Sequence, residues 1–242
     1  METAKNDMIA HLRGLILLRQ GLQKIPGSHP VDMGLGNLCA AFPDHHFPIA
    51  AIHEFICTNP EDKTASTGFI VGLLSKLLKR NGACIWIAPA QTIFPPALIA
   101  FGIDPSRIIF ATLPREKEQL WVMEEALKCD SLSAVVGDIR NLDFTASRRL
   151  QLSVETSKVT GFLIRETTRV NTTACVSRWK ISSAKTVLPD GMPGIGFPRW
   201  KVDLLKIRGG KPGSWILEWR NKKFKEVIDT PARMHEAQRM IS

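Results

Sequence analysis

The sequence CTNPEDKT, which ends in Lys63 and Thr64, has the spacing of a phosphate-binding loop. In such loops, of the form GxxxxGKT, the two glycines let backbone N–H groups close around a phosphate, while the lysine and the hydroxyl engage phosphate and Mg²⁺. Here Cys57 and Asp62 replace the two glycines, and Glu61 adds a second carboxylate. Negative charges at that place oppose an anion. We therefore expect a solvated loop that keeps only the spacing of a nucleotide site, without a bound cofactor.

A nucleotide-hydrolysing site needs two further parts, an acidic residue that holds Mg²⁺ and an acid that activates water. Asp138 ends the hydrophobic run AVVGD, where an acidic residue would hold Mg²⁺, although a carboxylate there also commonly caps a strand end or pairs with a neighbour such as Arg140. An acid that activates water is missing where Ala90 stands. A non-catalytic protein is favoured, and a weak DNA-dependent ATPase that uses Lys63, Thr64 and Asp138 stays as an alternative.

The histidines and cysteines do not form a convincing metal or nucleophile site in the sequence. His45 and His46 stand beside Asp44, with His53 nearby, but adjacent histidines on a loop seldom reach one ion without further ligands at defined spacing. We expect a surface loop there and no bound metal. The cysteines are widely spaced and mostly set among apolar residues, which is typical of reduced core thiols; they are Cys39, Cys57, Cys84, Cys129 and Cys175.

Most of the net charge of +9 comes from the C-terminal part of the sequence. Tryptophans at 179, 200, 215 and 219 are interleaved with basic residues there, as in proteins that stack the bases of single strands and neutralise their phosphates. Half-buried strands have the same pattern, and the alternation places Trp200 in the core. Phosphate contacts need only the outward charges. The candidate DNA contacts are Arg199, Lys201, Arg208, Lys211, Arg220, Lys222, Lys223 and Lys225.

An amphipathic helix is predicted from 3 to 24, where apolar residues recur at helical spacing before Pro26 and Gly27. It stands apart from the core segments, so its apolar stripe needs a partner surface. The candidate partner-binding residues are Met8, Ile9, Leu12, Leu15 and Ile16. We divide the chain into this N-terminal helix (1–26), a linker (27–46), a core (47–228) and a C-terminal tail (229–242).

Strands and helices alternate along the first part of the core, which predicts a parallel sheet with helices on its faces. Strands are expected at 49–57, 83–88, 107–111, 133–138 and 160–165, and helices at 65–80, 95–101, 116–128 and 145–157. In the last helix we expect Phe144 and Leu152 to pack on the sheet, with Arg148 and Arg149 left for solvent or a partner. Three runs at 174–182, 199–208 and 214–220, separated by turns rich in Gly and Pro, predict a closing set of antiparallel strands.

Several blocks of the core resemble RecA in order and spacing, among them IHEF, FIVGLLSKLLKR, CIWIAPA, AFGIDPSRIIF, LWVMEEALK, SAVVGDI, LDFTASRRLQLSVE and GFLIRE. The resemblance is closer still to the ImuA family, shortened RecA relatives encoded beside the polymerase-like ImuB, and PRWKVDLLKIRGGKPGSWILEW extends it towards the C-terminus. It implies an α/β, RecA-like fold, with a mostly parallel twisted sheet flanked by helices and ending in antiparallel strands. One departure is PDHHFP, at a loop that is usually glycine-rich in the family.

The resemblance also implies a function. ImuA-type proteins are accessories of damage-induced (SOS) translesion DNA synthesis and mutagenesis, so the implied partners are an ImuB-like protein and an error-prone replicative-type DNA polymerase, with RecA itself and single-stranded DNA as further candidates. The family generally lacks intact nucleotide motifs, and this sequence agrees. A stand-alone single-stranded DNA-binding module is the second alternative.

The composition sets outer limits on these interpretations. With 242 residues, 44% of them hydrophobic and 23% charged, the chain has the make-up of an ordinary globular protein. At that length neither disulfides nor a structural metal is needed for a core. The sequence shows no signal peptide and no apolar run long enough to span a membrane, so we expect a cytoplasmic protein without a membrane partner.

Overall fold

The computed structural model describes residues 31–78, 82–186 and 194–227. The amphipathic helix predicted at 3–24, with its partner-binding stripe, lies outside the described residues, and so does the tail predicted at 229–242. Within the described ranges, no helix has both the length and the apolar character needed to cross a bilayer.

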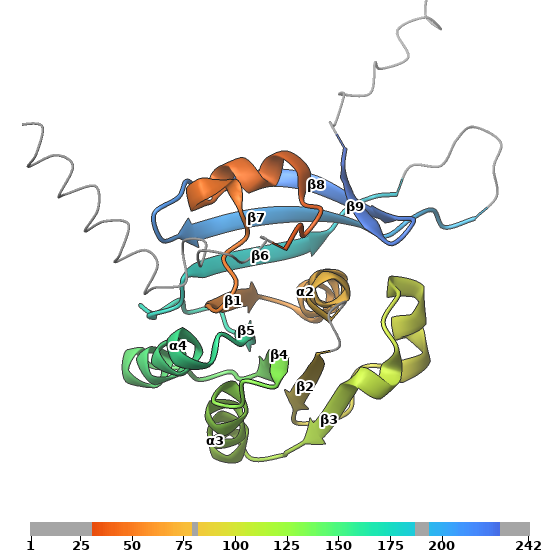
Figure 1. Cartoon of the computed structure of the whole chain (residues 1–242). Helices are drawn as coiled ribbons and strands as arrows, with labels where there is room; N and C mark the ends of the chain where they lie inside the picture. Colours follow the sequence, from red (N-terminus) through yellow and green to blue (C-terminus); the bar gives the residue numbers. More distant parts are fainter. Residues whose placement is uncertain (1–30, 79–81, 187–193, 228–242) are drawn as a thin grey trace, which may run out of the picture.

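A nine-stranded sheet forms the centre of the described chain, in the order β3-β2-β4-β5-β1-β6-β7-β8-β9 (Figure 1). Neighbours from β3 to β6 in this order pair parallel, and those from β6 to β9 pair antiparallel. The fold is therefore α/β and RecA-like, as the resemblance implies. The strands are β1 (Ile52–Cys57), β2 (Ala83–Ala88), β3 (Ile108–Thr112), β4 (Leu132–Asp138), β5 (Thr160–Glu166), β6 (Ser177–Ser183), β7 (Arg199–Ile207), β8 (Gly213–Arg220) and β9 (Lys223–Glu226).

Helices cover the parallel part of the sheet on both faces. Helix α2 (Pro60–Leu77) lies on one face, while α3 (Glu116–Leu127) and α4 (Phe144–Ser157) lie on the other (Figure 1). Shorter 3-10 helices are η1 (Gly36–Ala41), η2 (Pro43–His45), η4 (Pro95–Phe101) and η5 (Pro105–Arg107). Each strand between β1 and β5 thus delivers its carboxyl end to one edge of the sheet, which is where ligands bind in open α/β folds.

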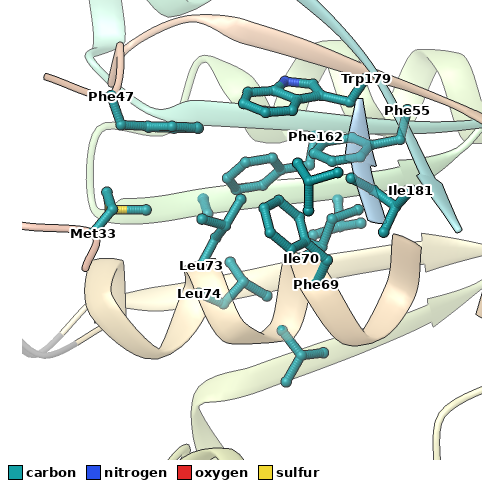
Figure 2. Packing of buried hydrophobic residues seen from close by; sticks show 14 of the residues in the cluster. Met33, Phe47, Phe55, Phe69, Ile70, Leu73, Leu74, Phe162, Trp179 and Ile181 are labelled. Carbon is teal, nitrogen blue, oxygen red and sulfur yellow. The ribbon is translucent and has the colours of Figure 1, made fainter. Parts of the chain in front are cut away.

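The larger of two hydrophobic clusters lies between α2 and the sheet. Figure 2 shows Phe69 and Leu73 of α2 facing Phe55, Phe162 and Trp179 of the strands. The rings of Phe55 and Trp179 stack at a centroid distance of 6.0 Å and an interplanar angle of 10°. Ring pairs of this kind add about 0.5–1.5 kcal/mol to the burial of their area. This cluster packs the antiparallel strands against the middle of α2.

The segment from 31 to 46, expected as a linker, contributes to this same cluster. Met33, Leu35 and Leu38 are at most 1% exposed, and Phe42 packs edge-on against Phe47. The Gly, Pro, Asp and His residues of this stretch indicated a linker, whereas the apolar residues between them anchor it.

Helix α4 departs from its prediction. The expectation that Phe144 and Leu152 pack on the sheet was wrong, because these side chains are 54% and 46% exposed. The helix instead buries Ala146, Leu150 and Val154, which recur every four residues on a different stripe. Arg148 and Arg149 are exposed beside the two apolar side chains.

Candidate functional site

The segment that resembles a phosphate-binding loop is a tightly capped helix start. Helix α2 begins at Pro60, five residues before the helix expected from 65, so Lys63 and Thr64 are helical. The side chain of Asn59 accepts a hydrogen bond from the Asp62 N–H at 2.7 Å, and Pro60 occupies the first helical position, where its missing N–H costs nothing. The expected solvated loop is therefore replaced by an ordered turn of two residues, Thr58 and Asn59, between β1 and α2.

Asp62 occupies the place at the helix N-terminus where an anion would bind. Its Oδ2 accepts hydrogen bonds from the Thr58 N–H at 3.3 Å and the Thr58 hydroxyl at 2.7 Å, and the residue is only 5% exposed. A carboxylate here gains from the helix dipole as a phosphate would. The protein thus supplies its own anion to the donors that a phosphate would need.

Lys63 and Asp138, far apart in the sequence, form an ion pair. The Nζ atom lies 2.6 Å from Asp138 Oδ2 and 3.6 Å from Glu166 Oε2, so the lysine bridges the carboxyl ends of β4 and β5. Asp138 is 4% exposed, and its Oδ1 accepts no hydrogen bond from the described residues. Arg140 lies 3.7 Å from Glu166 and does not pair with Asp138. The two residues with the spacing for phosphate and Mg²⁺ contacts are therefore engaged with each other.

The remaining residues of the motif are engaged as well. The Thr64 hydroxyl donates to the Pro60 carbonyl at 3.0 Å, one helical turn back. Burial raises the pKa of the Cys57 thiol to about 11, so at neutral pH the thiol is protonated and a poor nucleophile. Ala90 has no group that could activate water. As they stand, these contacts do not fit a bound Mg²⁺ nucleotide, and we derive no reaction step through one.

Sequence reasoning missed a buried charge network around Glu54 of β1. This carboxylate, 1% exposed, forms ion pairs with Arg165 of β5 and, at 2.7 Å, with Arg178 of β6, and it accepts a hydrogen bond from Thr173. Arg165 also donates to Asn171 and to the Arg140 carbonyl. The network could have been suspected from Glu54 itself, because it is a charged residue inside the apolar run IHEFIC. Such a run indicates a strand that is buried on both faces.

This network fixes the chain that follows β5. The segment 167–171 and the turn after β4 line a groove of about 740 Å³ next to the Lys63–Asp138 pair, and Arg165, Glu166 and Arg169 contribute to its walls. Buried charges of this kind are costly to leave unpaired, so they specify one arrangement of the segment rather than adding much stability.

The candidate DNA contacts do not all share one surface. Lys201, Arg220, Lys223 and Lys225 are exposed on strands β7, β8 and β9, and Arg208 is half-buried at the end of β7. Arg199 is held by Glu218 at 3.2 Å. Lys211 lies in the hairpin between β7 and β8, where its backbone N–H donates to the Ala41 carbonyl. The Lys222 side chain lies beside Gly102, 3.1 Å from the position that a Cβ on this glycine would take.

The tryptophans belong to the core rather than to a base-stacking surface. Trp179 is fully buried, Trp200 and Trp219 are each 5% exposed, and Trp215 is half-buried against the core cluster. Burial of Trp200, with Lys201 pointing outward, confirms the predicted alternation. Any nucleic-acid contact by these strands must therefore be made by charges.

The histidines are separated by the fold. His45 and His46 are exposed, whereas His53 is buried and bonds to the Pro48 carbonyl at 2.7 Å and to Ser177 Oγ at 2.6 Å. Among the residues that the structure describes, no group of three or more His, Cys, Asp or Glu side chains is placed to hold a metal ion.

Comparison with known proteins identifies relatives over most of the chain. No protein-family model matches the sequence. Proteins named Protein ImuA from two strains of Caulobacter vibrioides are each 32% identical to it over 201 residues, which is 78% of this chain and 82% of the relative. Identity at this level over most of both chains extends beyond short motifs.

Proposed function

The chain belongs to the ImuA family, and on that premise we propose that it is a non-catalytic adaptor in damage-induced (SOS), error-prone translesion DNA synthesis. It acts in the cytoplasm with an ImuB-like polymerase homologue and an error-prone replicative-type polymerase, which it holds together at DNA lesions. RecA is a further candidate partner, because the fold is shared.

One observation carries the non-catalytic part of this proposal. The Lys63–Asp138 ion pair, at 2.6 Å, occupies both residues that a nucleotide complex would need for phosphate and metal. Binding ATP would require Lys63 to leave a buried carboxylate, and the phosphate would compete with the Asp62 carboxylate for the Thr58 donors. Removing one partner of a buried pair typically costs about 3–5 kcal/mol, which a weakly bound nucleotide cannot supply. An adaptor needs surfaces that bind its partners, and it does not need a nucleotide site.

The alternative of a weak ATPase is supported by a single feature. Asp138 Oδ1 is a buried acceptor that receives no hydrogen bond within the described ranges, and it lies beside a lysine, as a metal-binding carboxylate would. This alternative requires Mg²⁺-dependent ATP binding through Lys63, whereas the adaptor does not.

The partner surface in this proposal is the apolar stripe of Met8, Ile9, Leu12, Leu15 and Ile16, which lies outside the described residues. Burying such side chains contributes about 1.5–3 kcal/mol each before the ordering costs of association. Two charges placed in the stripe should therefore abolish association with a partner.

The experiment is co-purification of the untagged ImuB-like protein and polymerase with the tagged full chain. We expect both to be retained by the parent protein and lost with Leu12→Asp plus Ile16→Asp. A control variant, Gln20→Asp plus Gln23→Asp, makes the same charge change in the same segment and should retain them. Failure of the parent protein to retain either partner would contradict the adaptor. Retention by both variants would exclude the stripe and redirect the search to α4 and the C-terminal strands.

A further inference from the structure

Strands β6 to β9 present two chemically different faces. Every second residue, including Trp179, Val202 and Trp219, points towards α2 and belongs to the core cluster. The intervening residues lie on the opposite face and are exposed or half-buried, although the Lys180 side chain reaches Asp62 at the start of α2, at 4.0 Å. We call this second surface the outer basic face; its charged members are Arg178, Lys180, Arg199, Lys201, Asp203, Lys206, Arg208, Glu218, Arg220, Lys223 and Lys225.

The charges on the outer basic face are not balanced by one another. Only Asp203 and Glu218 are acidic, and they pair with Lys201 at 3.4 Å and Arg199 at 3.2 Å. Within the described part of the chain, no ion pair engages the remaining cations of β7 to β9, which are Lys206, Arg208, Arg220, Lys223 and Lys225. An excess of positive charge is therefore fixed on one side of a rigid sheet.

Cross-strand register brings like charges together on this face. Arg220 lies directly opposite Lys223, and Arg178 lies directly opposite Lys206. Like charges in opposed positions destabilise a sheet by some tenths of a kcal/mol to about 1 kcal/mol. Glu54 offsets the second pair in part, but it is shared between Arg178 and Arg165. Stability therefore does not account for this arrangement, whereas an external anion would relieve it.

Two cations at the end of β7 are held in place on the side of α4. Lys206 Nζ and Arg208 Nη2 donate to the carbonyls of Thr173 and Ala174 at 3.2 and 2.9 Å, which fixes both cations without neutralising them. Burial lowers the pKa of Arg208, Glu155 of α4 opposes this shift, and Arg148 of α4 adds to it. The outer basic face therefore ends beside a helix that carries charges of both signs.

We propose that the outer basic face binds the phosphodiester backbone of DNA, without reading its bases. Four strands about 4.8 Å apart and nine residues of β7 at about 3.3 Å each make a face of roughly 14 by 30 Å, long enough for several nucleotides. The tryptophans that could stack bases are buried, so the contact is with phosphates alone. The choice of DNA over RNA rests on the function proposed above.

An acidic protein is a poorer fit to this surface. Protein interfaces depend on a few large side chains in a desolvated centre, and Leu205, at 47%, is the exposed large apolar side chain on these strands. The chain's own ends are not suitable occupants either. Residues 1–30 carry four basic and two acidic side chains, and residues 228–242 carry two of each. Neither segment can neutralise the face.

The test compares two pairs of substitutions drawn from the same basic stretch of sequence. Lys206→Gln plus Lys225→Gln removes two charges from the outer basic face. The control pair, Lys211→Gln plus Lys222→Gln, also removes two charges, but from outside this face. Lys211 lies in the hairpin that bonds to Ala41, and the Lys222 side chain lies beside Gly102. Binding of the full-length protein to a fluorescent single strand, and to the matching duplex, is followed by anisotropy over a range of salt concentrations. Thermal unfolding of each variant serves as the folding control.

For the single strand, we expect the first pair to make the slope of log affinity against log salt concentration shallower by about 1.4. This corresponds to about 0.7 for each of the two lost phosphate contacts. The second pair should leave the slope unchanged, and strands of different base composition should bind alike. Comparison of the affinities for the single strand and for the duplex shows which form of DNA the face binds. Equal effects of the two pairs, or binding of polyglutamate but not of DNA, would overturn the inference. Either result would leave the adaptor proposal standing if the ImuB-like protein is still retained, so the two can fail separately.

Discussion

Individual buried charges in this protein are balanced by partners from distant parts of the chain. Lys63 pairs with Asp138, and Glu54 pairs with Arg165 and Arg178. The residue types and their spacing could be read from the sequence, including the loss of both glycines at 57 and 62. That Lys63 pairs with Asp138 could not, because the contact depends on the strand order, in which only β5 separates β4 from β1.

The burial of His53 predicts how stability depends on pH. The Pro48 carbonyl can only accept, so Nε2 carries the proton and Nδ1 accepts from Ser177. Burial lowers the pKa of His53 from 6.5 to about 3, and the imidazole is neutral in the folded protein. The unfolded chain binds a proton below pH 6.5, so this contribution to stability is complete above that pH and is lost as the pH falls towards 3.

Urea unfolding between pH 7 and pH 4 measures this effect. His53 should add a slope of up to about 1.4 kcal/mol per pH unit to the acid loss of stability. His53→Gln lowers stability at pH 7 but should show a shallower decline on acidification. A decline as steep as that of the parent protein would mean that His53 is not buried in its neutral form.

At the scale of elements, the alternating hydrophobic runs predicted every strand of the parallel sheet and the three longest helices. The boundaries that failed have physical causes. Helix α2 starts early because Asn59 and Pro60 cap it, although the polar residues that follow resemble a loop. Strand β9 was not predicted, since Lys223–Glu226 is short and mostly charged, and it forms only by pairing with β8. Two-residue turns with left-handed residues, here Asn221 and Lys222, favour such hairpins.

The packing of strand β9 on helix α2 predicts the effect of a substitution at Gly72. A Cβ placed on Gly72 would lie 2.5 Å from Cζ of Phe224, whose ring is buried and cannot easily move. Helix propensity alone would make Gly72→Ala stabilising by about 1 kcal/mol. We expect the overlap with the ring to prevail, giving a net loss of about 1–2 kcal/mol in the free energy of unfolding.

A double-mutant cycle tests this contact. Phe224→Leu shortens the side chain over Gly72, so Gly72→Ala should cost less in that background than in the parent. The measurement is the urea midpoint of the four proteins. Stabilisation of the parent by Gly72→Ala, or strictly additive effects, would show that β9 does not pack on α2.

For the molecule as a whole, most cations of the outer basic face lie on β7 to β9, whereas the residues with phosphate-loop spacing lie at the start of α2; Lys180 of β6, 4.0 Å from Asp62, is where the two meet. The sequence predicted the basic stretch but not its division, because Lys211 and Lys222 leave the face that Lys201, Lys206 and Lys225 share. That division depends on two hairpins. If both proposals hold, such a protein would need no nucleotide cycle to remain on DNA while it holds its partners.

In the proposed function the protein works without binding a nucleotide. The test is titration of the full-length protein, and of Lys63→Ala, with a fluorescent ATP analogue in the presence of Mg²⁺. We expect no saturable signal from either protein, because Lys63 is paired with Asp138 and the Asp62 carboxylate holds the donors of Thr58. Saturable, Mg²⁺-dependent binding by the parent protein that is lost in Lys63→Ala would contradict the claim and favour the ATPase.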